Sequence, residues 1–491
     1  MQPEWPFPEM PPREVQERAL AAGWGKPGFA FFMRQRLGKT LVAYAEFTML
    51  REAGAVDWMI VICPNSIKQQ WRDQIEEVDI TTPIHIYNSQ KKKHFEEWSE
   101  GCKATGGVLI INYESIKSFM IAGYWQKIDT VRAYIVGDEI TEIKTPTAKQ
   151  TKATLELASI CSIKRILTGK PTANSNADLW SPLRFINATD DNFHQFQHRY
   201  TMQGGYKGKQ FKQNINVDML KKLMTPFCYI PDQKYIEGKF ERIYEPPRLV
   251  EMTGKQKQMY DDMENELIAE LSGDINITAP IVLTKYLRLQ QISSGIVGDI
   301  EGEQHNIVEP ENNPRIKETI KILENEVSNK VIIVCRFKKS IDNLHQVLTA
   351  KGYKVAVMIG GMGDWLEEQK KLFTEGDHDI LLAQIQVLSY GHTLCGTATN
   401  PCLDMIFFEN NFSLIDRAQC EARPEHMDRI KATSYHDMYA SAMDRVIVKA
   451  LIRKEDAAIA LLGYTRNLGL MPSGDGWVIQ PGAMGAPSWM K

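Results

Sequence analysis

A lysine and a threonine stand where a phosphate-binding loop would place them. The segment RLGKT, Arg36 to Thr40, follows the apolar run FAFFM and precedes the helix-like segment LVAYAEFTML. A glycine-containing loop between a buried strand and a helix offers free backbone N–H groups to a polyphosphate. Lys39 would then reach the β- and γ-phosphates, and Thr40 would hold a magnesium ion. The complete GxxxxGK[ST] pattern is not present, because Met33 occupies the position of its first glycine.

Two adjacent carboxylates follow another strand-like segment further along the chain. The segment AYIVGDE ends in Asp138 and Glu139, and ligands of parallel sheets bind at the carboxyl ends of strands. Asp138 could hold the metal ion through water, while Glu139 could orient or deprotonate an attacking water molecule. Each segment alone has a structural alternative, a polar turn before a helix for the first and a solvated loop entry for the second. Together they favour a magnesium–nucleotide site.

Two stretches that alternate strand-like and helix-like segments must position these residues. Short runs rich in Ile, Val and Phe indicate buried parallel strands. They lie at Phe29–Met33, Trp58–Cys63, Val108–Asn112, Ala133–Gly137 and Arg165–Thr168, and then at Val331–Cys335, Lys354–Met358, Asp379–Ala383 and Leu403–Glu409. Helices are predicted between them, as at Leu41–Glu52 and Ser340–Lys351. The sequence therefore predicts an α/β fold with two parallel sheets.

A different kind of segment separates these two stretches. It contains the polar loop GGYKGKQFKQN and helical pieces near Lys255–Leu271 and Ile281–Ser293, and it is followed by an acidic stretch rich in Gly, Asn and Pro. We predict a first lobe at residues 1–182, a mainly helical insertion at 183–297, a hairpin or linker at 298–314, a second lobe at 315–469 and an irregular tail at 470–491.

The composition is that of a soluble globular protein. The 491 residues carry a net charge of −3, with 43% hydrophobic and 24% charged residues. These values exclude a wholly disordered chain, a collagen-like chain, a coiled-coil rod and a protein that is basic throughout, although local basic patches remain possible. We expect no signal peptide and no membrane span. Eight cysteines without a CxxC pair argue against a zinc site or a disulfide framework and favour a cytoplasmic location.

The motifs and their order give the chain a family resemblance. It resembles superfamily 2 helicase-like ATPases of the Swi/Snf type and is similar to the compact versions encoded by bacteriophages. The resemblance extends from roughly Arg13 to Leu462. Its motifs are, in chain order, Gln16 ahead of the phosphate loop, RLGKT, VICPNSIKQQW, INYESI, GDEITEIKTPTAKQTKA, LTGKPTANSNADLWS, KVIIVCRF, SYGHTL and QCEARPEHMDR.

The resemblance implies two RecA-like lobes with a helical insertion between them, and ATP and Mg²⁺ as cofactors. It implies catalytic roles for Lys39, Asp138, Glu139, Gln419 and Arg423. The implied nucleotide-binding residues are Gln16, Leu37, Gly38, Lys39, Thr40, Gly391 and Arg429, with Thr40 and Asp138 as metal ligands. Gln16 would read adenine, and Arg423 would be an arginine finger. The implied nucleic-acid contacts are Pro64, Asn65, Ser66 and Tyr113, together with Lys207, Lys209 and Lys212 in the insertion.

Four positions depart from the pattern of the family. Arg36 replaces the glycine of GLGKT, Thr141 replaces the histidine of DEAH and Lys170 replaces the second threonine of LTGTP. His426 occupies the usual position of the second arginine of the last motif, with Arg429 nearby as a substitute. Because an arginine finger accelerates phosphoryl transfer by orders of magnitude, the loss of one of two would make a slow ATPase.

The function implied by the resemblance is that of a DNA-dependent ATPase. It would act as a double-stranded DNA translocase or helicase in phage or bacterial DNA replication, recombination or repair. We expect a monomer that binds duplex or branched DNA without sequence preference and works with phage or host replication and repair proteins. Two alternatives stay open: an RNA helicase of the same superfamily, and a non-catalytic DNA-binding module with a degenerate ATPase.

Overall fold

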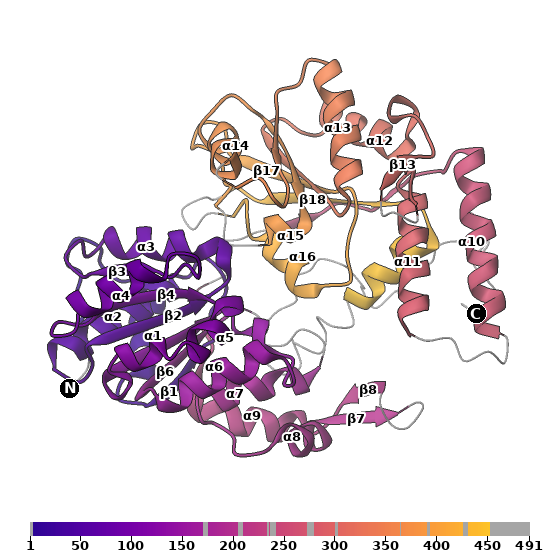
Figure 1. Ribbon diagram of the computed structural model, residues 1–491. Coiled ribbons are helices and arrows are strands. Elements are labelled where there is room, and N and C mark those ends of the chain that lie inside the picture. The colour runs from indigo at the N-terminus through magenta and orange to yellow at the C-terminus, as the bar shows by residue number, and fades with distance from the viewer. Residues whose placement is uncertain are drawn as a thin grey trace. The chain divides into compact units, whose positions relative to one another are not determined.

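The protein is described by a computed structural model. The description covers residues 3–169, 175–204, 210–232, 235, 242–272, 279–299, 303–363, 365–389, 393–425 and 431–451. The described chain forms two compact units, residues 3–235 and residues 242–451, and each is treated by itself (Figure 1). The division falls inside the predicted insertion at 183–297, so the segments of that stretch are shared between the units. The domain boundaries stay a prediction.

The first unit is built on a parallel sheet of seven strands in the order β3-β4-β2-β5-β6-β1-β9. A two-stranded antiparallel hairpin of β7 and β8 projects beyond α8 (Figure 1). The elements are α1 (Glu14–Gly23), β1 (Gly28–Phe31), α2 (Lys39–Glu52), β2 (Trp58–Cys63), α3 (Lys68–Glu76), β3 (Ile84–Ile86), α4 (Lys92–Gly101), β4 (Gly107–Asn112), α5 (Tyr113–Ile121), β5 (Ala133–Asp138), α6 (Lys149–Ile160), β6 (Ile163–Leu167), α7 (Trp180–Phe185), α8 (Phe193–Tyr200), β7 (Thr201–Gly204), β8 (Gln210–Asn214), α9 (Val217–Met224) and β9 (Cys228–Tyr229).

Helices cover both faces of this sheet, which explains why its central strands are apolar throughout. Alternate residues of β2, such as Ile60, join the hydrophobic core formed with α4, α5, α6 and α7. The residues between them, such as Met59, are fully buried on the opposite face. There α2 packs against β5, where the rings of Phe47 and Tyr134 lie 6.1 Å apart.

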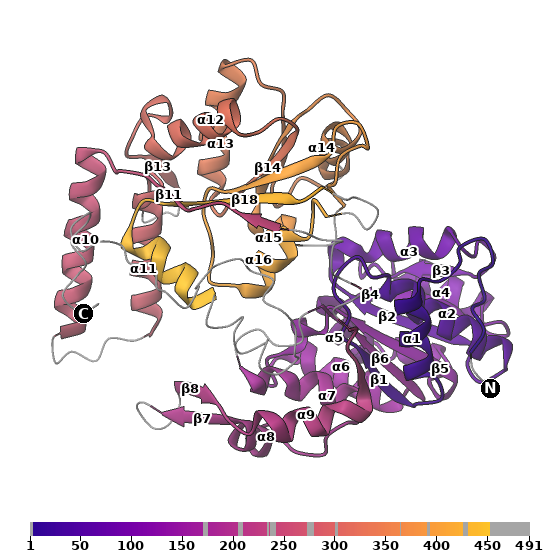
Figure 2. The same cartoon turned by 180° about the vertical axis from the view of Figure 1, so that it is seen from behind.

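The second unit is also built on a parallel sheet, with the order β10-β18-β17-β14-β16-β15 and β11 as a further partner of β18. Its helices α10 and α11 lie side by side in both views (Figures 1 and 2). The elements are β10 (Arg242–Tyr244), β11 (Arg248–Leu249), α10 (Gly254–Ser272), α11 (Ala279–Ser293), β12 (Ile296–Gly298), β13 (Gln304–Asn306), α12 (Pro314–Asn325), β14 (Lys330–Cys335), α13 (Lys338–Ala350), β15 (Val355–Met358), α14 (Trp365–Thr374), β16 (Ile380–Gln384), α15 (Ile385–Leu388), β17 (Cys402–Phe407), α16 (Leu414–Glu421) and β18 (Thr433–Tyr439).

The two faces of the second sheet contact different helices. Val331 and Ile333 of β14 face the core formed with α12 and α13. Ile332 and Val334 face the core formed with α14, α15 and α16. The structure therefore confirms the predicted α/β class with two parallel sheets.

The predicted strands agree with β1, β2, β4, β5 and β6, and with β14 to β17, within a few residues at each end. The acidic stretch predicted as a hairpin or linker at 298–314 begins at the last residue of β12 and contains β13, which pairs antiparallel with β12. The sequence analysis missed β3, β9, β10, β11 and β18. It also predicted a polar loop at GGYKGKQFKQN, where the structure has β8 and the last residue of β7. No helix among the described residues is long and apolar enough to cross a membrane.

Candidate nucleotide and nucleic-acid sites

The predicted phosphate-binding loop connects β1 to α2. Gly38 is the N-cap of α2 and adopts a left-handed conformation with φ of 77°. Lys39 and Thr40 therefore lie in the first helical turn, whose backbone N–H groups have no partners within the helix. The side chain of Leu37 is fully buried, so a contact of this residue with a nucleotide must come from its backbone. The Nζ atom of Lys39 donates to the carbonyl oxygen of Arg34 at 3.4 Å.

Arg36 has a backbone conformation that favours glycine. Its φ is 69°, in the left-handed region that glycine enters without strain. A non-glycine residue there costs roughly 1–2 kcal/mol. The substitution therefore strains the loop slightly and leaves its path suited to phosphate binding.

Gln16 lies directly against this loop. Its Nε2 atom donates to the carbonyl oxygen of Gly38 at 3.3 Å, and its Oε1 atom accepts from the backbone N–H of Arg13 at 2.9 Å. A Cβ atom on Gly38 would lie 2.3 Å from Nε2 of Gln16. The glutamine predicted to read adenine is thus fixed over the phosphate loop by two hydrogen bonds.

The carboxylate of Asp138 lies at the carboxyl end of β5. Its Oδ2 atom accepts from Nε1 of Trp71 at 2.7 Å, and its Oδ1 atom accepts from the backbone N–H of Glu139 at 3.0 Å. Burial and the neighbouring carboxylate of Glu139 raise the pKa of Asp138 to about 6, against the opposing charge of Lys39. The structure therefore brings Asp138, Glu139 and Lys39 within electrostatic reach of one another.

Glu139 is connected to the segment that follows β6. It adopts a left-handed conformation with φ of 47°, and its Oε2 atom accepts from Oγ1 of Thr168 at 3.4 Å. Thr168 is the second residue of the segment LTGKPT. Thr141, which replaces the family histidine, is buried. The carboxylate that would activate water is thus linked to LTGKPT through Thr168, while Lys170 lies outside the described residues.

The donor set at the end of β5 fits Mg²⁺. Magnesium prefers oxygen ligands and is usually held by one or two carboxylates, water and substrate phosphates. Thr40 offers a hydroxyl, and the buried carboxylate of Asp138 has a raised pKa, as expected where a nearby cation would be favourable. Among the described residues, no group of three or more His, Cys, Asp and Glu side chains could hold a metal ion by itself.

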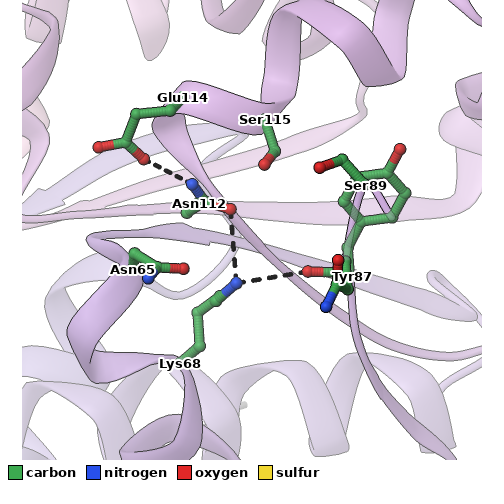
Figure 3. Close-up of a pocket in the computed structure, with 8 residues that line it drawn as sticks. Asn65, Lys68, Tyr87, Ser89, Asn112, Glu114 and Ser115 are labelled. Atoms are coloured by element: carbon green, nitrogen blue, oxygen red, sulfur yellow. Dashed lines mark hydrogen bonds between the residues drawn. The ribbon is translucent and has the colours of Figure 1, made fainter. Parts of the chain in front are cut away.

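An open polar hollow of about 340 Å³ lies near the ends of β2, β3 and β4 (Figure 3). At its centre, Nζ of Lys68 donates to the carbonyl oxygen of Tyr87 at 3.3 Å and to Oδ1 of Asn112 at 3.4 Å. Nδ2 of Asn112 donates to Oε2 of Glu114 at 2.6 Å. Burial lowers the pKa of Lys68. The lining residues are Asn65, Lys68, Tyr87, Asn88, Ser89, Asn112, Glu114 and Ser115.

Only some of the predicted nucleic-acid contacts lie at this hollow. Asn65 lines it, and Pro64 and Ser66 are the neighbours of Asn65 in the same turn. The Tyr113 side chain is 1% exposed and its hydroxyl donates to the carbonyl oxygen of Asp138 at 2.7 Å, so a nucleic-acid contact of this residue must come from its backbone. Sequence reasoning missed Lys68, although KQQW in the quoted motif contains it.

Three of the predicted nucleic-acid contacts are lysines of the insertion loop. Lys207 and Lys209 lie outside the described residues. Lys212 belongs to β8, but only its backbone is described.

In the second unit, Gln419 lies on α16 and Arg423 follows the end of that helix. Arg423 is buried, and its Nη2 atom donates to the carbonyl oxygen of Ser389 at 2.6 Å. Gln419 is partly exposed. Gly391, His426 and Arg429 lie outside the described residues.

A buried charge network that the sequence analysis did not find supports α16. Arg417 donates to Oε1 of Glu421 at 2.6 Å and to both carboxylate oxygens of Asp437 on β18, at 2.7 and 3.0 Å. The spacing of Arg417 and Glu421, one helical turn apart, is the one local signal of this network.

The sequence of this chain is similar to those of known proteins. The model of the SNF2-related domain family matches residues 35–295. A chromatin-remodeling ATPase INO80 of Emericella nidulans is 23% identical over 244 residues, which is 47% of this chain and 15% of that protein. The INO80 protein of Homo sapiens is 24% identical over 246 residues, 48% of this chain and 15% of that protein. This chain thus corresponds to a small part of the length of these relatives.

Two solved structures are also similar to this chain. The Sulfolobus solfataricus SWI2/SNF2 ATPase core in complex with dsDNA has a TM-score of 0.43 and 19% identity, and the alignment covers 94% of this chain and 97% of that chain. The Sulfolobus solfataricus SWI2/SNF2 ATPase core domain has a TM-score of 0.41 and 18% identity, with 97% and 93% covered.

Proposed function

The chain belongs to the SNF2-related family, whose model matches more than half of it, and we propose that it is a DNA-dependent ATPase that translocates on double-stranded DNA. One observation supports the enzymatic part above all others. Asp138 is the last residue of β5, Glu139 follows it, and the charge of Lys39 from the phosphate loop acts on Asp138. Hydrolysis of a nucleoside triphosphate requires this set of groups.

Each of these groups has a role in the proposed reaction. Lys39 and the backbone N–H groups at the start of α2 bind the phosphates, and Gln16 contacts the adenine. Thr40 and Asp138 would hold Mg²⁺, which would neutralise negative charge on the phosphates. The carboxylate of Glu139 takes a proton from the attacking water, and Thr168 keeps that carboxylate in place. The products are ADP and phosphate.

The second unit contributes Gln419 and Arg423 in this proposal, with Gly391 and Arg429 as further nucleotide contacts. The guanidinium of Arg423 stabilises the charge that develops on the transferred phosphoryl group. Such a residue is worth orders of magnitude in rate.

The polar hollow of the first unit is the proposed contact for the DNA backbone. Lys68 supplies a positive charge and Asn65, Asn112 and Ser115 supply neutral polar groups. Groups of this kind bind phosphates and sugars without reading the base sequence. Pro64, Ser66 and the lysines Lys207, Lys209 and Lys212 complete the proposed DNA surface.

The biological setting is part of the proposal and depends on resemblance alone. We propose a monomer that acts in phage or bacterial DNA replication, recombination or repair, together with replication or repair proteins. The relatives named above are chromatin-remodeling ATPases. We therefore include remodelling of protein–DNA complexes in the proposal. An RNA helicase and a non-catalytic DNA-binding module are the alternatives. The glycine-like shape of Arg36 and the link from Thr168 to Glu139 favour a working ATPase.

Phosphate release measured with wild type, Lys39→Ala and Glu139→Gln tests the enzymatic proposal. With saturating duplex DNA, the wild type should hydrolyse ATP and both variants should fall to background. Equal rates in all three proteins would support the non-catalytic alternative. A higher rate with single-stranded RNA than with duplex DNA would support the RNA helicase.

Binding of a fluorescent duplex at several salt concentrations tests the hollow. Lys68→Ala should weaken binding and reduce the salt slope by about one charge. Lys92→Ala is the matched control, because Lys92 is an exposed lysine of the same unit outside the hollow. Identical salt slopes for Lys68→Ala and the wild type would rule out the hollow as a phosphate contact.

A further inference from the structure

An arginine of β10 holds the end of the helix that precedes Arg423. β10 is the first described strand of the second unit and pairs in parallel with β18. The side chain of Arg242 is 7% exposed, and its Nη1 atom donates to Oε2 of Glu421 at 2.5 Å. Its Nε atom donates to Oε1 of Glu425 at 2.7 Å. One guanidinium therefore connects two carboxylates of the QCEARPE segment.

These two carboxylates stand on either side of Arg423 in the sequence. Glu421 is the last residue of α16 and Glu425 comes two residues after Arg423. The side chains of both are almost fully buried, at 0% and 3% exposed. The planar fork of an arginine suits such bidentate contacts, and a lysine cannot reproduce them. Arg242 thus fixes the backbone before and after Arg423.

The contact is supported on the side of the arginine as well. The hydroxyl of Tyr244, on the same strand, donates to Oε2 of Glu421 at 3.2 Å. The guanidinium carbon of Arg242 lies 5.7 Å from the ring centre of Tyr435 on β18. The strand pairing and these two contacts hold Arg242 in one place.

We propose that Arg242 is a positioning residue for Arg423. It anchors Glu425 and, together with Arg417, Glu421, so that the backbone that carries Arg423 between these two residues keeps one position. This inference depends on the proposed function, in which Arg423 accelerates ATP hydrolysis. It adds that β10, the first described strand of the second unit, fixes the position of Arg423.

The test is a double-mutant cycle measured as ATP hydrolysis with saturating duplex DNA. Arg242→Gln should lower kcat by about 10- to 100-fold, the size of effect expected from misplacement of a catalytic group, with the KM for ATP and the DNA affinity near their wild-type values. In the background of Arg423→Ala, the same substitution should change kcat less than about twofold, because Arg242 acts through Arg423.

Two further variants separate positioning from general stability. Arg242→Gln combined with Glu425→Gln should recover part of kcat, because the buried carboxylate that loses the charge of Arg242 is then removed as well. Arg248→Gln is the matched control: Arg248 lies on β11, which pairs with the same β18, and it contacts Glu326 at 2.5 Å. It should leave kcat unchanged. If Arg242→Gln does not fold, Arg242→Lys carries the same cycle and should show an intermediate loss.

The possible results are distinct. If the effects of Arg242→Gln and Arg423→Ala multiply, Arg242 has a structural role only and the inference is overturned. It is also overturned if the Arg248→Gln control loses kcat to the same degree. If Arg423→Ala alone is as fast as the wild type, the proposed role of Arg423 fails first, and hydrolysis that still requires Lys39 would keep the ATPase proposal intact.

Discussion

Replacing Gly38 by alanine should weaken ATP binding through Gln16. Gly38 has φ of 77°, and a Cβ atom there would lie 2.3 Å from Nε2 of Gln16. Because that atom is the end of a flexible side chain, the amide should swing away and lose its hydrogen bonds to Gly38 and Arg13. The two hydrogen bonds that hold Gln16 in place contribute about 1 kcal/mol each, or about 2 kcal/mol together. Because the displaced amide must regain this position at that energetic cost when ATP binds, the KM for ATP should increase by roughly 10- to 30-fold.

Gly54 provides a control with the same backbone conformation. It follows the other end of α2 with φ of 72°, and nothing lies within 4 Å of a Cβ atom placed on it. Each alanine should cost about 1–2 kcal/mol of unfolding free energy from the left-handed conformation alone. Gly54→Ala should therefore lose stability without a change in KM.

The assay is steady-state hydrolysis of ATP and GTP with saturating duplex DNA, alongside urea unfolding. We expect Gly38→Ala to raise the KM for ATP and to reduce the preference for ATP over GTP. Gln16→Ala should reproduce both effects without the loss from backbone strain. If Gly38→Ala and Gly54→Ala have the same KM for ATP, or if Gln16→Ala keeps the full nucleotide preference, the reasoning is refuted.

Three further predictions follow from buried contacts of the first unit. Arg165→Met should reduce the unfolding free energy of the first unit, measured by urea unfolding, by about 3–5 kcal/mol, because the buried carboxylate of Glu46 loses a partner at 2.5 Å. Adding Glu46→Leu should restore most of that loss. An unchanged loss in the double variant would contradict the pairing argument. Trp71→Phe should raise the Mg²⁺ concentration needed for half-maximal hydrolysis by about tenfold, because Asp138 loses a hydrogen bond to its charged form; a magnesium titration that matches the wild type would refute this. Burial, with smaller contributions from His94 and Arg72, lowers the pKa of His85 from 6.5 to about 4. The unfolded chain therefore binds this proton more readily, and stability should fall as the pH drops from about 6.5 towards 4. Urea unfolding at pH 7 and pH 5 should show a smaller drop for His85→Phe, and an equal drop would exclude His85 as the cause.

Local patterns predicted most of the sheet strands but not β18. Its sequence, TSYHDMY, looks polar, yet His436 and Asp437 are both buried. His436 contacts Asp404 at 3.2 Å, and Asp437 contacts Arg417. Because the partners of these side chains come from distant segments, no local hydrophobic period marks the strand. β3 was missed for a simpler reason, since a strand of three residues carries little pattern.

The candidate site could likewise be predicted only in part from local patterns. Lys39, Thr40, Asp138 and Glu139 stand next to the strands and helix that position them, so their motifs could be identified from the sequence. The contacts that orient them, such as the one from Trp71 to Asp138, join segments far apart in the chain.

Tyr113 makes a contact of the same kind. Its motif suggested a nucleic-acid contact, but its hydroxyl binds the backbone of Asp138. Which face of a turn a side chain occupies depends on packing that the motif does not contain.

The central claim is that DNA binding drives ATP hydrolysis at Lys39 and Glu139. The most direct measurement is the rate of phosphate release by the wild type as duplex DNA is titrated at constant ATP and Mg²⁺. We predict a rate that rises to a plateau with DNA and stays at background in Lys39→Ala. A wild-type rate that is indifferent to duplex DNA, or a Lys39→Ala variant that follows the same curve, would contradict the account.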